Sequence, residues 1–146
     1  MTIVLGSDHA GFGYKQHLAT FLREQGHTVH DVGTHSKDSV DYPDFAVEAA
    51  KTVAAGNAEF GVLVCGSGIG VAMTANKVAG VRAANCLTED MARLARQHNN
   101  ANVLTVGERL VSLDVAKAVV AAFLATPFEG GRHEQRVAKI HALTGC

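Results

Sequence analysis

The residues best suited to chemistry begin at Cys65, which follows the short apolar run 61–64 and precedes a stretch rich in glycine. The run predicts a strand buried on both faces, and residues 69–77 predict a helix, so the thiol is expected at the carboxyl end of a strand. Glycines leave the backbone N–H groups between strand and helix open to an anion. They are Gly66, Gly68 and Gly70. The pattern predicts an anion cradle beside a thiol, whose thiolate could act as a base.

The spacing of these glycines separates the loop from two common nucleotide-binding motifs. The dinucleotide fingerprint requires a third glycine where Val71 stands, and the Walker pattern requires a Lys-Ser or Lys-Thr pair after the glycines. Neither requirement is met. A structural explanation also exists, because a glycine-rich turn can simply join a strand to a helix and a free cysteine is commonly a small buried side chain.

A second group of candidate residues comes late in the chain. Arg132 and Arg136 are one turn apart on the last predicted helix, where two guanidinium groups could clamp one phosphate. His98 could carry protons near neutral pH, although a histidine between polar residues is more often a surface or capping residue. His27 and His30 should point to opposite faces of a strand, and no third ligand is evident, so no metal site is predicted.

Strand and helix patterns alternate along the chain and must position these residues. Strands are predicted at 2–5, 28–32, 61–64, 81–84 and 102–106, and helices at 13–25, from 43 onward, and at 69–77, 88–97, 113–125 and 132–143. This alternation predicts an α/β fold of three layers, with an open, mostly parallel, five-stranded sheet and helices on both faces. Ligands of such sheets bind where the strand order reverses, and Asp8, His9 and Cys65 are expected there.

The composition indicates one domain, residues 1–146, with 47% apolar residues, 18% charged residues and a formal net charge of -1. These values argue against disorder, a nucleic-acid partner and a polybasic membrane surface, so a small-molecule partner is expected. The three cysteines are widely spaced, which argues against disulfides and structural zinc and favours a reducing compartment. No leader or membrane segment is predicted, and a cytoplasmic protein is expected.

Five separated motifs carry a resemblance that covers essentially the whole chain. They are SDHAG at 7–11, DYPDFA at 41–46, CGSGIG at 65–70, RQHNNANVL at 96–104 and GGRHEQRV at 130–137. In this order they resemble the type B ribose-5-phosphate isomerases, whose family also includes the galactose-6-phosphate isomerase subunits. The resemblance implies a Rossmann-like fold, no metal or organic cofactor, and a homodimer with shared active sites, in which the C-terminal helix packs on the partner. A dimer of dimers is the larger assembly to consider.

The resemblance also implies roles for particular residues. Cys65 matches the base that abstracts the proton, His98 the group that opens the sugar ring, and Ser67 is the third catalytic position. Ser67 stands where several close relatives carry threonine, and Ala75 occupies the stretch in which another branch places a glutamate base. The positions implied to bind substrate are Asp8, His9, Asp41, Tyr42, Gly66, Ser67, Gly68, Ile69, Gly70, Asn99, Arg109, Arg132 and Arg136.

The implied activity is the interconversion of D-ribose 5-phosphate and D-ribulose 5-phosphate, in the non-oxidative branch of the pentose phosphate pathway. It proceeds by proton transfer through an enediolate. An isomerase of allose 6-phosphate or galactose 6-phosphate is one alternative, and a nucleotide-binding regulatory module on the same fold is another. We also expect the apolar residues in and just before the helix at 113–125 to cover both the sheet and a partner subunit. They are Leu110, Val111, Val119, Val120, Phe123 and Leu124.

Overall fold

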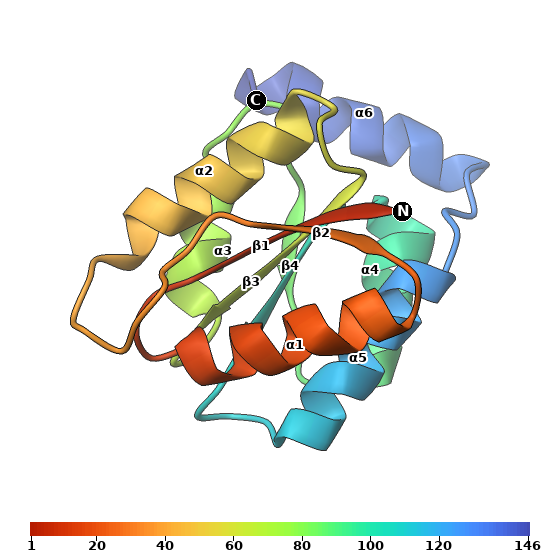
Figure 1. Ribbon diagram of the computed structural model, residues 1–146. Coiled ribbons are helices and arrows are strands. Elements are labelled where there is room, and N and C mark those ends of the chain that lie inside the picture. The colour runs from red at the N-terminus through yellow and green to blue at the C-terminus, as the bar shows by residue number, and fades with distance from the viewer.

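The computed structural model describes residues 1–146, which form five strands and six helices in one domain (Figure 1). The strands are β1 (Thr2–Ser7), β2 (Thr28–Asp31), β3 (Phe60–Cys65), β4 (Ala83–Asn85) and β5 (Val103–Gly107). The helices are α1 (Phe12–Glu24), α2 (Tyr42–Ala54), α3 (Ile69–Ala75), α4 (Glu89–Asn99), α5 (Leu113–Ala125) and α6 (Arg132–Thr144). Every predicted element is present, with its bounds shifted by a few residues at most.

The sheet has the order β2-β1-β3-β5-β4, and every pair of neighbouring strands is parallel. The expected open, five-stranded sheet is confirmed, but it is parallel throughout, since each connection between strands contains a helix. The order reverses between β1 and β3, because the chain leaves β1 toward β2 and then crosses to the other side. The ends of β1 and β3 therefore flank the expected ligand position.

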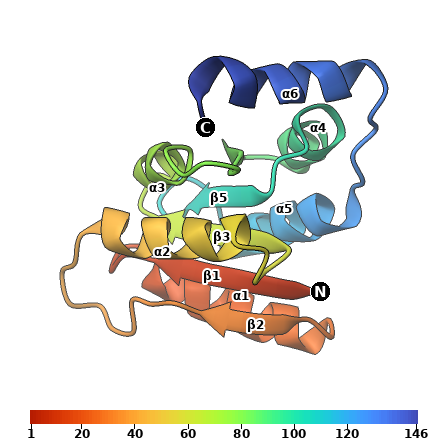
Figure 2. The ribbon, with the colours of Figure 1, turned by 90° about the horizontal axis from the view of Figure 1, so that it is seen from above.

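Helices cover both faces of the sheet, which gives the predicted three layers (Figure 2). Helices α1, α4 and α5 pack on one face around Leu5, Val62 and Val64, whereas α2 and α3 pack on the other around Val4 and Leu63. Successive side chains of β3 point to opposite faces of the sheet, so Val62 and Val64 face one set of helices and Leu63 faces the other. Cys65 packs with Val4 and Leu63, so its side chain lies on the α2 and α3 side of the sheet.

The turn between α3 and β4 explains why the predicted helix and strand are both shorter than expected. The side chain of Asn76 donates to the carbonyl of Ala83 over 2.9 Å and accepts from its N–H over 2.8 Å. The Asn76 amide thus bonds both backbone groups of Ala83, as a neighbouring strand would at the start of β4. The helix therefore ends at Ala75, and the strand begins two residues later than its pattern predicts.

Helix α5 has the predicted bounds, and the apolar residues in and just before it divide between the core and the surface. Val119, Val120 and Phe123 are fully buried against the sheet of their own chain. Leu110 before α5 and Val115 on it are exposed, and further exposed apolar side chains lie on α3, α4 and α6, at Met73, Leu94 and Leu143 among others. No helix has the length and apolar character needed to cross a membrane.

Candidate active site

A hollow of about 410 Å³ lies at the carboxyl edge of the sheet, beside the ends of β1 and β3. It is lined by Asp8, His9, Ala10, Tyr42, Cys65, Gly66, Ser67, Gly70, Arg109 and Leu110. An adjoining hollow shares Asp8, His9 and Tyr42 and adds Asp41. The fold thus brings together side chains from four separate stretches of sequence, in the place predicted from the strand pattern.

The Cys65 thiol lies at the bottom of this hollow, with 4% of the residue exposed. Its sulfur accepts a hydrogen bond from the N–H of Gly68 over 3.1 Å. Gly68 has a φ of 78°, and a Cβ there would lie 2.3 Å from Oδ1 of Asn85. At Gly70, a Cβ would lie 2.6 Å from the ring of Tyr42. Both glycines are therefore required for the loop to pass this close to its neighbours.

Asp8 and His9, in the turn after β1, each accept a hydrogen bond from a backbone N–H. Asp8 is buried and accepts the N–H of Gly11 over 3.0 Å, which fixes the turn after β1. His9 accepts the N–H of Val40 at Nδ1 over 3.1 Å. Because Nδ1 acts as an acceptor, the ring proton of neutral His9 is assigned to Nε2, where it can be donated to a ligand.

Arg109 brings a positive charge to the same hollow. Its backbone N–H donates to the carbonyl of Gly66 over 3.0 Å. Its guanidinium Nη1 lies 3.0 Å from the place of a Cβ on Gly66, so the side chain passes directly over that glycine. An anionic group entering the hollow would meet both this guanidinium and the N–H groups of the loop.

The second predicted group, His98, Asn99, Arg132 and Arg136, lies outside the hollow. His98 is near the end of α4, and Arg132 begins α6, which lies beside α4 (Figure 2). Nε2 of His141 on α6 lies 2.8 Å from Nη1 of Arg82, just before β4, so α6 lies at the amino ends of β4 and β5. Cys65 pairs with Gly107 at the opposite end of β5. The length of this strand, about 13 Å, therefore separates the two ends of the sheet. Within one chain, the predicted base and the predicted ring-opening histidine do not meet.

His98 stacks on His133, with ring centroids 4.4 Å apart and planes 13° apart. Sequence reasoning gave His133 no role. Only 6% of it is exposed, and its Nε2 lies 3.5 Å from a carboxylate oxygen of Glu129. Burial, followed by the positive charges of His98 and Arg132, lowers the pKa of His133. His133 is therefore favoured as a neutral ring next to His98.

The side chains of His98, Glu129 and His133 bring potential metal ligands within 4.8 Å of one another. However, the lone pairs of imidazole nitrogens lie in the ring planes, and the two planes are nearly parallel. The lone pairs therefore run side by side instead of converging on one ion. This geometry does not fit a chelate, and we assign no metal to these residues.

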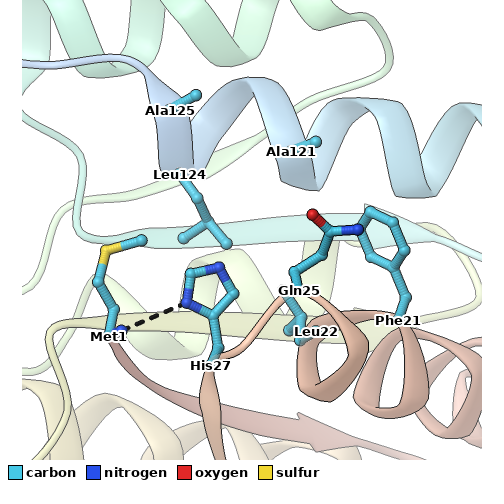
Figure 3. A pocket seen from close by; sticks show the side chains of 8 residues that line it. All are labelled: Met1, Phe21, Leu22, Gln25, His27, Ala121, Leu124 and Ala125. Atoms are coloured by element: carbon cyan, nitrogen blue, oxygen red, sulfur yellow. Dashed lines mark hydrogen bonds between the residues drawn. The ribbon is translucent and has the colours of Figure 1, made fainter.

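A different hollow, of about 340 Å³, lies between α1 and α5 (Figure 3). Its lining is largely apolar, with side chains such as Phe21 and Leu124 facing into it. Nδ1 of His27 lies 3.3 Å from the N-terminal amine of Met1. No predicted site residue lines this hollow, and its polar groups, which come from Met1, Gln25 and His27, include no thiol, carboxylate or guanidinium. We therefore place the candidate site at Cys65.

A thiol, an amide-rich loop and an arginine at the switch point of a parallel α/β sheet make a site suited to a small, polar, anionic ligand. The model of the family described as ribose/galactose isomerase matches residues 3–140. The chain belongs to this family, which confirms the predicted resemblance and the isomerase class.

Individual relatives agree with this assignment. The chain is 46% identical over 141 residues to ribose-5-phosphate isomerase B of Escherichia coli K12, which covers 97% of this chain and 95% of that protein. The structure of Clostridium thermocellum ribose-5-phosphate isomerase B matches with a TM-score of 0.98 at 47% identity, covering 99% and 98% of the two chains. That of the Mycoplasma genitalium enzyme with bound ribulose 5-phosphate matches with a TM-score of 0.94 at 41% identity, covering 99% and 96%.

Proposed function

We propose that this protein interconverts D-ribose 5-phosphate and D-ribulose 5-phosphate, with Cys65 as the base. The observation that carries the proposal is the Cys65 sulfur in a polar hollow, 3.1 Å from the N–H of Gly68. The names of the relatives support this substrate over a hexose phosphate and over the nucleotide-binding alternative. The reaction needs one group that exchanges a proton with carbon and others that stabilise the oxyanion.

In the proposed reaction, the Cys65 thiolate takes the proton from C2 of the open-chain aldose. The electron pair of the C–H bond forms the C1–C2 double bond of an enediolate, whose negative charge lies on the former carbonyl oxygen. The thiol then returns the proton to C1, which leaves the carbonyl at C2. Amide N–H groups of the loop from Gly66 to Gly70 would stabilise the oxyanion at little cost in reorganisation, because the fold already fixes them.

Ser67 is the proposed third catalytic group. Its Oγ accepts the N–H of Ile69 over 3.2 Å, which leaves the hydroxyl proton free for the substrate. Moving the carbonyl also requires a proton to pass from the oxygen on C2 to the oxygen on C1. A hydroxyl that both donates and accepts is suited to this transfer. The polar side chains of Asp8, His9, Asp41 and Tyr42 would bind the sugar hydroxyls, and Arg109 would bind an anionic part of the substrate.

We further propose a homodimer in which His98, Asn99, Arg132 and Arg136 of one chain complete the hollow of the other. The location of this second group at the far end of its own sheet supports the proposal, since proton transfer requires contact of about 3 Å. Arg132 and Arg136 are both exposed, as residues that reach a partner's ligand must be. Exposed apolar residues on α3, α4 and α6, such as Met73, Leu94 and Ile140, offer a surface for the second copy.

The test is a set of steady-state rates with ribose 5-phosphate, allose 6-phosphate and galactose 6-phosphate, in EDTA and without added cofactor. We expect the pentose phosphate to give the highest kcat/KM. Cys65→Ala should lower kcat by roughly 100-fold to 10,000-fold. Cys86→Ala is the matched control, because Cys86 is buried in the core on the other face of the sheet and should not affect chemistry. Near-normal turnover of Cys65→Ala would refute the proposed base.

We also propose that the protein works in the cytoplasm. Its three cysteines are all free, and a thiol base must remain reduced to accept a proton. Localisation of the tagged protein by cell fractionation would test this, and recovery in an oxidising compartment would contradict it.

A further inference from the structure

Two polar side chains that contact the backbone of the glycine loop, Thr105 and Asn85, have no part in the reaction proposed above. Thr105 lies on β5 and is fully buried, and Asn85 lies next to it at the end of β4. Burying a hydroxyl in a sheet is unfavourable unless it forms hydrogen bonds. The partners of Thr105 therefore show what this residue stabilises.

Both side chains contact carbonyl groups of the loop. The hydroxyl of Thr105 donates to the carbonyl oxygen of Gly68 over 2.8 Å, and Oδ1 of Asn85 lies 3.1 Å from the same hydroxyl. Nδ2 of Asn85 donates to the carbonyl oxygen of Ser67 over 3.4 Å. Thr105 and Asn85 thus hold the carbonyls of two successive peptide groups.

Holding a carbonyl also directs the N–H of the same peptide, because the peptide group is planar and trans. The peptide from Ser67 to Gly68, held by Asn85, directs its N–H to the sulfur of Cys65, 3.1 Å away. The peptide from Gly68 to Ile69, held by Thr105, directs its N–H to Oγ of Ser67, 3.2 Å away. Asn85 and Thr105 therefore fix the N–H groups that contact the two proposed catalytic groups, Cys65 and Ser67.

We propose that Asn85 is a positioning residue that holds the Gly68 N–H on the sulfur of Cys65, and that Thr105, whose hydroxyl lies 3.1 Å from Oδ1 of Asn85, positions Asn85 in turn. A hydrogen bond to a charged sulfur is stronger than one to a neutral thiol, so alignment of the donor shifts the balance toward the thiolate. The effect on the reaction rests on the proposed role of Cys65 as the base. The alignment itself does not.

The test compares Thr105→Val, which removes the hydroxyl at nearly constant shape, with Thr105→Ser, which keeps it. The Gly68 carbonyl also accepts the N–H of Ala72 over 3.3 Å, so Thr105→Val leaves it one partner. The readout is the rate of Cys65 alkylation by iodoacetamide against pH without substrate, measured by mass spectrometry of the peptide that contains Cys65. Cys146 is an internal control, because its alkylation should not change.

In Thr105→Val, we expect Cys65 alkylation at neutral pH to slow by about threefold to tenfold, with a fall in kcat of similar size. KM should stay within about twofold, and Thr105→Ser should behave like the wild type. An unchanged alkylation profile, with only a lower melting temperature, would make Thr105 a purely structural residue and overturn the proposal.

Asn85→Ala provides a second variant should Thr105→Val not fold. Asn85 is partly exposed, and its removal should shift the alkylation profile in the same direction. An unchanged alkylation profile in Asn85→Ala would refute the proposal. Because alkylation requires no substrate, an active Cys65→Ala enzyme would refute the proposed mechanism and leave this result standing.

Discussion

The separation of Cys65 from His98 allows a decisive test of the shared site. In one chain, these side chains lie toward opposite ends of β5, whose length is about 13 Å. Ring opening and proton abstraction involve neighbouring atoms of the sugar, and each transfer needs a donor and an acceptor about 3 Å apart. A single chain does not satisfy both conditions, so the two residues must come from different chains if both act.

The perturbation is a heterodimer of one Cys65→Ala chain and one His98→Asn chain, produced by co-expression with two different tags and purified on both. One of its two sites then contains both native residues, and the other contains neither. Its turnover in the direction from ribose 5-phosphate should be about half that of the wild-type dimer. Each variant homodimer should show only its residual rate.

A reciprocal heterodimer separates the two arrangements. It pairs a wild-type chain with a chain that carries both Cys65→Ala and His98→Asn. In a shared site, each of its active sites lacks one residue, so turnover should fall to the residual level. In an unshared site, the wild-type chain would keep about half the activity. Half activity in this reciprocal dimer, together with an inactive first heterodimer, would refute the reasoning.

Three further predictions concern single residues. His98→Asn should lower the initial rate from the cyclic aldose more than that from the open-chain ketose, and equal losses at saturation would contradict a role in ring opening. Gly68→Ala should lower both stability and kcat, because φ is 78° and the new Cβ would meet Asn85; urea unfolding and kinetics would detect this, and a wild-type-like variant would contradict it. The lowered pKa of His133 means that the unfolded chain binds its proton at a higher pH than the folded chain. The free energy of unfolding should therefore fall as pH drops below about 6.5, and the fall should be smaller in His133→Gln, as urea titrations at several pH values would show.

Much of the site could be predicted because its signals are local. The apolar run before Cys65 and the glycines after it specify a strand, a tight turn and a helix within one short stretch. The polar turn after β1 is equally local, and parallel strands bring both turns to one edge. The start of α4 is local as well, because the side chain of Thr88 accepts the N–H of Met91 three residues later.

Other features depend on contacts between distant segments. The stacking of His133 on His98 joins α6 to the end of α4, and the support of the loop by Thr105 requires β5 to lie beside β3. Nothing in the sequence near His133 or Thr105 indicates these neighbours. The burial of Val119 and Phe123 in their own core was likewise decided by how α5 lies on the sheet.

The sequence by itself therefore determined the order of the elements, the parallel α/β class and the cradle at Cys65, because each follows from the periodicity and the residue types of a short segment. Only the tertiary structure decided which candidates meet. It placed Arg109 over Gly66 and moved His98 to the opposite end of the sheet. The physical reason is that helices antiparallel to the strands carry residues such as His98 back across the sheet, and packing alone fixes which edge each residue reaches.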